Sequence, residues 1–218
     1  MSGTIKPVPG QGQWQPSREA GEPAALDWPR IDAWTADVVR GDCRSIAAVF
    51  EAAGVDAPLL LWDPPCDAGA AAPIQFVLDH WRALGGGERV PEAAAIEPDQ
   101  LKPALGYLML LDPVDYSRDF RYRLYGTKIA RISNFDMTGR LLSSFPSSAY
   151  ATEFAIATYR AVLIRNAPLY TVRRPAMGEF TSYWQRLALP LADKNGAMLR
   201  VLGCTVAIDT EGRMVEVV

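Results

Sequence analysis

The sequence predicts an α+β fold, and two patterns in its 218 residues support that prediction. Five segments have a strand pattern, which is either alternation of apolar and polar residues or a short unbroken apolar run. Other segments repeat apolar residues every three or four positions, as helices do when they bury one face. Two strand patterns precede a long helical pattern and three follow it. A chain of this length can bury a substantial core.

Composition and pattern divide the chain into five parts. The first part is rich in Pro, Gly and Gln, so it cannot bury enough apolar surface to offset its ordering entropy. A Pro- and Ala-rich linker is the main expected boundary. In order, the parts are a disordered leader (1–30), a helical segment (31–62), the linker (63–73), the α+β domain (74–210) and a C-terminal tail (211–218).

Helices are expected in the first half of the chain. Ile31, Trp34 and Val38 recur at helical spacing, and a second helical run follows them. Asp42 is the expected N-cap of that second run, because an Asp side chain accepts a hydrogen bond from the first turn of a helix. A third helix with an apolar face is expected over 74–85.

The strand patterns lie around a long helix that is expected over about 148–165. The unbroken apolar run "LGYLMLLD" is typical of a strand buried on both faces. Lys194-Asn195-Gly196 joins the last two strands, and Asn-Gly favours a type I′ hairpin turn. The expected strands span 105–112, 118–126, 168–175, 181–192 and 197–208, with short helical pieces at 127–135 and 138–144.

Three short stretches give this order of elements a specific resemblance. They are "HWRALGGGERVP", "FRYRLYGTKIA" and "MTGRLLSSF". Their order and spacing are similar to those of a bacterial branch of PAS domains, and the resemblance covers about 74–210. It implies a five-stranded antiparallel sheet with helices over one face, enclosing a small pocket. It also implies ligand sensing, cofactor binding, dimerisation or partner contact, and does not decide among them.

Composition and charge argue against several classes of function. A formal net charge of −3 gives no electrostatic reason to expect DNA or RNA as a partner. Three well-separated cysteines and one histidine do not form a Cys/His metal site, so no metal is expected. No segment reads as a signal peptide or a membrane span, so we expect a cytoplasmic protein without a membrane partner.

The resemblance implies two possible cofactors, flavin and haem, each of which requires a characteristic residue. The sequence disfavours both, so the cofactor is unknown. Flavin-binding light sensors of this fold need the cysteine of a Gly-Arg-Asn-Cys motif, whereas the aligned residues here are Gly139-Arg140-Leu141-Leu142. Haem-binding members use a histidine on the long helix, and that helix has none. His80 is the only histidine, and it lies on the preceding helix.

Apolar walls with a few hydroxyl groups predict a pocket for a small molecule. Alternate residues of each strand share one face and supply most of it, and helical residues supply the rest. The candidates are Tyr107, Met109, Phe120, Tyr122, Leu124, Ile129, Ile132, Phe135, Leu141, Phe154, Thr158, Arg173, Leu187, Leu189, Cys204 and Val206. Arg174 and Arg186 join Arg173 as groups that could hold a ligand carboxylate. The alternative, an ordinary filled core, stays open.

The opposite face of the sheet is expected to carry an interface. On strand 181–192, Trp184 and Arg186 alternate with Leu187, which puts them on the face away from the predicted pocket. That face is partly apolar and must be covered, either by helices of the same chain or by a second copy or partner protein. The interface candidates are Trp34, Phe50, Trp81, Tyr125 and Trp184, and a homodimer is expected.

These features predict a PAS-like sensory or regulatory module that binds a small molecule, a partner protein or both. Signalling is expected through ligand-dependent self-association or contact, as pocket occupancy shifts the helices against the sheet. A ligand-free structural or dimerisation module is the main alternative. An enzyme is not expected, because no nucleophile lies beside a base. A cone-shaped isomerase or hydratase is less favoured, because such folds need a polar residue deep in the cone.

Overall fold

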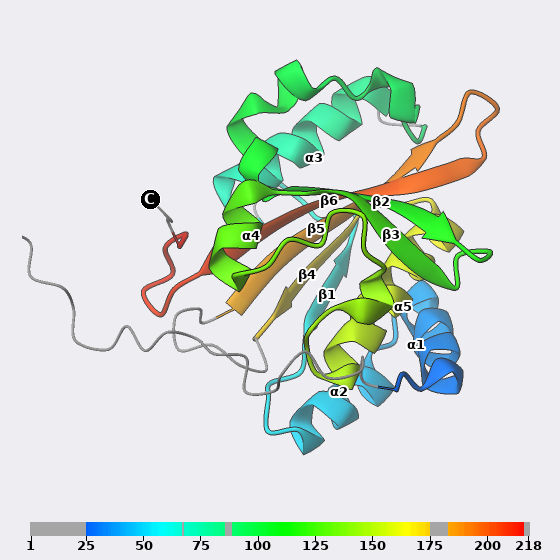
Figure 1. Ribbon diagram of the computed structural model, residues 1–218, viewed down its shortest axis with the longest axis vertical. Coiled ribbons are helices and arrows are strands. Elements are labelled where there is room, and N and C mark those ends of the chain that lie inside the picture. Colours follow the sequence, from blue (N-terminus) through cyan, green and yellow to red (C-terminus); the bar gives the residue numbers. More distant parts are fainter. Residues whose placement is uncertain (1–24, 67, 86–88, 175–182, 216–218) are drawn as a thin grey trace, which may run out of the picture.

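The computed structural model describes residues 25–66, 68–85, 89–174 and 183–215 (Figure 1). They form a six-stranded sheet, in the order β1-β4-β5-β6-β2-β3, in which every neighbouring pair is antiparallel. The strands are β1 (Leu59–Trp62), β2 (Leu108–Val114), β3 (Asp119–Tyr125), β4 (Leu169–Arg173), β5 (Tyr183–Ala192) and β6 (Met198–Ile208). The helices are α1 (Trp28–Arg40), α2 (Arg44–Ala52), α3 (Ala72–Gly85), α4 (Thr127–Ser133) and α5 (Ala149–Arg165), with 3₁₀ helices η1 (Ala93–Ala95), η2 (Pro98–Tyr107) and η3 (Leu142–Ser144).

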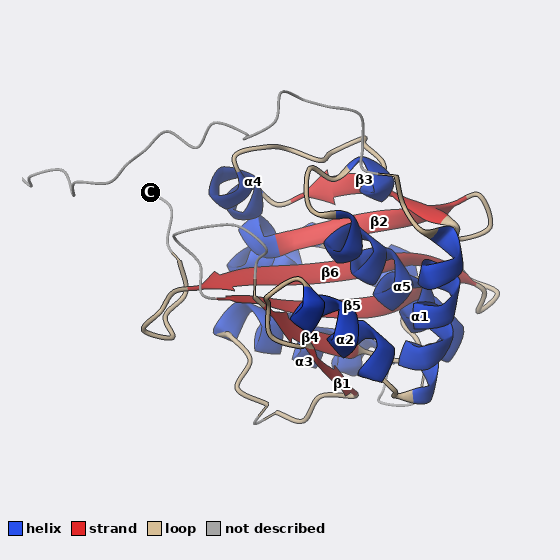
Figure 2. Cartoon of the chain, turned by 90° about the horizontal axis from the view of Figure 1, so that it is seen from below, coloured by secondary structure: helices blue, strands red, loops and turns tan. Residues whose placement is uncertain are grey.

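Helices cover both faces of the sheet. Figure 1 shows α3 on one side of it and α5 on the other, and Figure 2 shows α1 and α2 on the same side of the sheet as α5. The buried apolar residues accordingly form two clusters. One contains Met109 and Tyr122 with residues of α1, α2 and α5, and the other contains Leu108 and Leu187 with residues of α3 and η2. We call the two sides the α5 face and the α3 face.

The predicted α+β fold with an antiparallel sheet is confirmed, with two differences. The sheet has a sixth strand, β1, which lies in the segment predicted to be helical and pairs with β4. Helices also cover both faces rather than one. The reason is visible in β5, where every residue from Leu187 to Ala192 is buried. Exposing either face of such a strand would leave a large apolar surface in water.

The helical segment and the α+β domain share one core. Trp34 of α1 and Phe50 of α2 belong to the same buried cluster as Phe154 of α5. The rings of Phe50 and Phe154 meet edge to face, with centroids 5.4 Å apart. Most of the predicted leader over 1–30 lies outside the described residues, and α1 already begins at Trp28. The two N-terminal helices are therefore a layer of the same fold.

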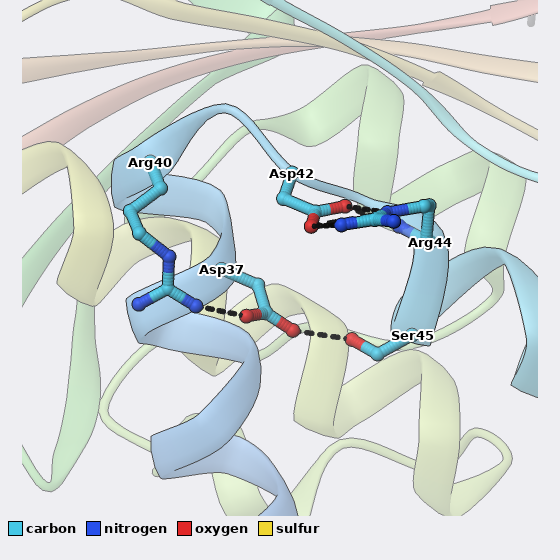
Figure 3. A network of polar contacts seen from close by, with 5 residues as sticks. All are labelled: Asp37, Arg40, Asp42, Arg44 and Ser45. Atoms are coloured by element: carbon cyan, nitrogen blue, oxygen red, sulfur yellow. Dashed lines mark hydrogen bonds and ion pairs between the residues drawn. The ribbon is translucent and has the colours of Figure 1, made fainter.

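Polar side chains hold the corner between α1 and α2 (Figure 3). Asp37 of α1 accepts a hydrogen bond from the hydroxyl of Ser45 in α2. Asp42 accepts hydrogen bonds from the guanidinium and the backbone N–H of Arg44, and these bonds hold the pKa of Asp42 well below its usual range. The prediction that Asp42 is the N-cap of α2 is wrong by one residue. Cys43 occupies that position and makes no side-chain capping bond, so Asp42 bonds the helix from just outside it.

A β-bulge in β3 changes which of its side chains face the core. Tyr122 and Leu124 pair with adjacent residues of β2, so Arg123 is an extra residue in β3. As a result, Tyr122 and Tyr125 both lie in the α5-face core, with ring centroids 5.3 Å apart. Leu124 is 40% exposed. The alternation predicted for this strand is therefore wrong after Arg123, and Leu124 is not a pocket residue.

The turn between β5 and β6 forms the predicted hairpin but is not of type I′. A type I′ turn needs positive φ at both central residues, and in this turn only Gly196 has it, with φ of 83°. Asp193 explains the difference. Its carboxylate accepts hydrogen bonds from the N–H groups of Asn195 and Ala197, which stabilises a longer turn.

Candidate functional site

A small pocket lies on the α5 face, where the start of α5 meets β4 and β5. Its volume is about 10 Å³, which is room for about one water molecule. Apolar side chains from η3 and α5 enclose two arginines from the sheet. The lining residues are Leu142, Phe145, Ser147, Ala151, Thr152, Ala155, Arg173 and Arg186.

Arg173 and Arg186 reach this pocket from neighbouring strands. Arg173 of β4 pairs with Trp184 of β5, so Arg173 lies on the same side of the sheet as Trp184 and Arg186. The guanidinium carbon of Arg186 lies 5.5 Å from the ring centroid of Tyr159 in α5. The Nε of Arg186 is buried and has no hydrogen-bond partner among the described residues. The strands thus bring two cations under α5.

Within the described part of the chain, neither of these arginines forms an ion pair. Arg174, the next residue, differs, because its Nε lies 2.9 Å from the carboxylate of Asp56 at the surface. Burial lowers the pKa of Arg173 to about 10, and the positive charge of Arg186 contributes to the shift. Arg173 still carries its full charge at neutral pH. The pocket therefore concentrates positive charge.

The tyrosines beside the arginines do not supply negative charge. Burial raises the pKa of Tyr159 and of Tyr122, although the positive charge of Arg186 opposes both shifts. Both phenols are neutral at physiological pH. The hydroxyl of Tyr159 is also buried without a hydrogen-bond partner among the described residues. It is a free donor in an environment that is rich in positive charge.

The N-terminus of α5 borders the same pocket. Ala151 and Thr152, in its first turn, are lining residues. The N-cap residue Ser148 makes no capping hydrogen bond, and its buried hydroxyl has no partner in the described structure. The first N–H groups of a helix have no intrahelical partner and carry the positive end of the helix dipole. This end of α5 adds to the potential of the two arginines.

The structure divides the predicted pocket residues between the two faces of the sheet. Arg173 lines the small pocket. Ile132 and Leu141 are half-buried. The α5-face cluster contains, or packs against, Met109, Phe120, Tyr122, Ile129, Phe135 and Phe154. The α3-face cluster contains Tyr107, Leu187, Leu189, Cys204 and Val206. These residues do not form the single wall that was predicted, because β5 and β6 are apolar on both faces and the pattern cannot tell the faces apart.

The long helix also turns a different side to the pocket than predicted. Phe154 packs on Phe50 of α2, and the hydroxyl of Thr158 donates hydrogen bonds to carbonyls of its own helix. The pocket side carries Ala151 and Ala155 instead. α5 lies between the sheet and the α1–α2 layer and is buried nearly all round. Apolar residues therefore occur on nearly all sides of α5, and their spacing cannot predict which side faces the pocket.

Most of the predicted interface residues are core residues of the single chain. Trp34, Phe50, Trp81 and Tyr125 are at most 8% exposed, and Trp184 is half-buried. Trp81 belongs to α3, and its indole N–H donates a hydrogen bond of 2.9 Å to a carbonyl of β5. The alternative of intramolecular packing therefore accounts for four of these five side chains.

Sequence reasoning missed the position of Arg186. It placed this side chain on an outer face, because the leucines that alternate with it were taken as the pocket wall. The structure places Leu187 and Leu189 under α3 and Arg186 under α5. The available signal was the charge itself. A charged residue inside an otherwise apolar strand is costly to bury, so it is a position to single out as a candidate for a site.

Other kinds of site are not evident in the described structure. Among the described residues, no group of three or more His, Cys, Asp or Glu side chains could hold a metal ion. His80 lies on α3, away from the pocket, and its ring stacks on Phe76 with centroids 6.5 Å apart. None of the described helices has the length and apolar character needed to cross a membrane.

The cysteines provide a direct test of the packing. Cys66 is exposed, Cys43 is half-buried and Cys204 is fully buried in the α3-face core. Burial raises the pKa of the Cys204 thiol well above its usual range, and the thiolate is the reactive form. With iodoacetamide on the native protein, we expect Cys66 to be labelled first, Cys43 more slowly, and Cys204 only after unfolding. Peptide mass spectrometry identifies the labelled residue, and early labelling of Cys204 would contradict the described core.

An antiparallel sheet with a long helix laid across it, and a small pocket between them, defines a class of α+β domain. A family model described as a PAS domain matches residues 70–206, which is more than half of the chain. The protein belongs to the PAS domain family, and this membership supports a sensory or regulatory role in general terms. No curated protein and no solved structure gives a significant match. The matched region contains the pocket, whereas α1, α2 and β1 precede it.

Proposed function

We propose that this PAS domain is a sensor that binds a small molecule in the pocket between α5 and the sheet. Binding changes how the α1–α2 layer packs, and the change is transmitted by self-association or by contact with a partner protein. The observation that supports the proposal is the pair of arginines in the pocket. Both residues are half-buried and form no described ion pair. A charge withdrawn from water without a partner costs stability, so a core that served only for packing would favour apolar residues at both positions.

The N-terminal part of α5 connects the pocket to α1. Thr152 lines the pocket, and Glu153, the next residue, is fully buried. The carboxylate of Glu153 accepts hydrogen bonds from the backbone N–H of Asp27 (2.8 Å) and from Nε of Arg30 (2.7 Å), at the start of α1. A displacement of this part of α5 therefore moves the attachment point of α1.

The size of the pocket makes such a displacement necessary. A cavity of about 10 Å³ holds about one water molecule, so a ligand of several heavy atoms must push its wall outward. The movable wall consists of η3, the chain after it and the first turn of α5. The sheet is held by its ladder of hydrogen bonds and is the rigid side. Ligand entry is thereby coupled to the helical layer.

Native mass spectrometry of freshly purified protein tests ligand binding. We expect an excess mass that is lost on denaturation, and its value begins the identification of the ligand. Protein stripped by unfolding and refolding is then compared with untreated protein by light scattering, where ligand loss should change the oligomeric state or partner binding. A bare protein whose association is insensitive to small molecules would leave only a ligand-free dimerisation module.

A further inference from the structure

We infer that the pocket takes a carboxylate group, held between Arg173, Arg186 and the N-terminus of α5. The inference rests on the proposed function, because it names the chemical class of the ligand of that site. Two guanidinium groups that line one pocket repel each other and lower the stability of the empty protein. An anion between them reverses both effects, which neither a neutral ligand nor a cation can do.

The donors at the site match a planar carboxylate. A guanidinium group presents parallel N–H donors that bind both oxygens of a carboxylate at once. The Nε of Arg186 is buried and unpaired among the described residues, so one such donor is already desolvated and available. The end of α5 adds further positive potential, as helix N-termini do at anion sites. The buried hydroxyl of Ser148, at that helix end, is a further unpaired donor.

Among the described residues, no acidic side chain pairs with Arg173 or Arg186. The fully buried carboxylate of α5, Glu153, is bound to Arg30 with an oxygen–nitrogen distance of 2.6 Å. The tyrosines beside the pocket are neutral at physiological pH, and burial raises their pKa values further. No carboxylate among the described residues therefore balances the charge of Arg173 and Arg186.

The room available favours a carboxylate over a larger anion. The cavity of about 10 Å³ must expand to admit either group, and a flat carboxylate of three heavy atoms needs less expansion than a tetrahedral phosphate. Leu142, Phe145 and Ala155 give the remaining wall an apolar surface. That wall suits a short hydrocarbon portion behind the carboxylate. The ligand class is accordingly a small organic acid.

Acetate and acetamide provide a matched pair of probes, since they have nearly the same shape and differ in charge. We expect acetate to raise the Tm of the full chain progressively with concentration, at ionic strength held constant with sodium chloride, while acetamide has no such effect. Inorganic phosphate is a third probe. A larger shift with phosphate than with acetate would overturn the carboxylate assignment in favour of a phosphate site.

Substitutions at the arginines test the location. Arg186→Met and Arg173→Met keep an unbranched apolar stem and remove the charge, and each should weaken acetate binding roughly 10- to 100-fold. Without acetate, both variants should be as stable as the unmodified protein or more so, because an unpaired buried charge is removed. Arg174→Met is the control, because Arg174 is exposed and paired with Asp56, and its acetate response should be unchanged.

Two outcomes would overturn the inference: equal responses to acetate and acetamide, or an acetate response that survives in both arginine variants. Arg186→Lys keeps the charge but loses the paired donors, and it gives an intermediate response should Arg186→Met fail to fold. Failure of the inference is distinguishable from failure of the proposed function. A neutral molecule retained in native mass spectrometry, with no acetate response, overturns the carboxylate alone. A bare protein without any response overturns both.

Discussion

Gly126→Ala is expected to lower the Tm by roughly 6–12 °C, from a loss of about 3 kcal/mol in the free energy of unfolding. Gly126 is the N-cap of α4, directly after β3. A Cβ atom there would lie 2.4 Å from the carbonyl oxygen of Gly106 and 2.9 Å from that of Leu108. Both contacts are with backbone, so no side chain can rotate away. The alanine can be accommodated only if the start of α4 separates from the junction of η2 and β2.

Gly85→Ala is the matched control for this prediction. Gly85 ends α3, and a Cβ atom there would lie 3.4 Å or more from Pro91, which is an ordinary contact distance. Alanine also has a higher helix propensity than glycine. We expect this variant to be as stable as the unmodified protein in thermal and urea unfolding. Similar Tm values for the two variants would mean that β3 and η2 do not approach as closely as described.

Glu153→Ala is expected to destabilise the protein by about 2–3 kcal/mol. The side chain of Glu153 is fully buried, whereas that of Arg30 is about one-third exposed (34%), so the loss falls below that of a fully buried pair. The variant leaves the backbone N–H of Asp27 and the guanidinium of Arg30 without their acceptor. Urea unfolding measures the loss. Hydrogen exchange should show its largest local increase in α1.

Glu51→Ala is the control, because Glu51 is exposed on α2 and the same change there removes no buried contact. A double-mutant cycle with Arg30→Met isolates the pair. If the coupling energy between Glu153 and Arg30 were near zero, the ion pair would not hold α1 on α5. The route from pocket to α1 would then lose its physical basis, while the pocket itself would be unaffected.

The pocket and the contact between α5 and α1 are connected because both involve adjacent residues of α5. Thr152 lines the pocket and Glu153 holds α1, and successive helix residues move together. The helices α1 and α2 precede the region that matches the PAS family model. An element outside the family region is thus bonded to a helix that lines the pocket inside it. The proposed regulatory role requires such a connection, because a signal needs a part that can change its contacts.

Local sequence determined most elements of this protein and their order, although not β1, which lies in the segment predicted to be helical. The helical spacing of Ile31, Trp34 and Val38 predicts α1, and all three side chains are buried. Asn-Gly between two strand patterns predicts the β5–β6 hairpin, which forms. These features depend on residues close together in the chain, through backbone preferences and the spacing of apolar side chains. The prediction of an α+β fold with an antiparallel sheet rests on them.

Only the tertiary structure decided which face of each element became the pocket. In β5, Leu187 is buried under α3, and Arg186, which is half-buried, lies under α5. The alternation of apolar and polar residues in a strand predicts which face is buried only if the other face is exposed. Here helices cover both faces of the sheet, so the alternation cannot tell them apart. The bulge at Arg123 and the burial of α5 on nearly all sides also prevent the sequence pattern from predicting which side chains face the pocket. The pairing of Arg173 and Arg186 therefore emerges from the register of β4 with β5 and from the helix above them, which no local pattern specifies.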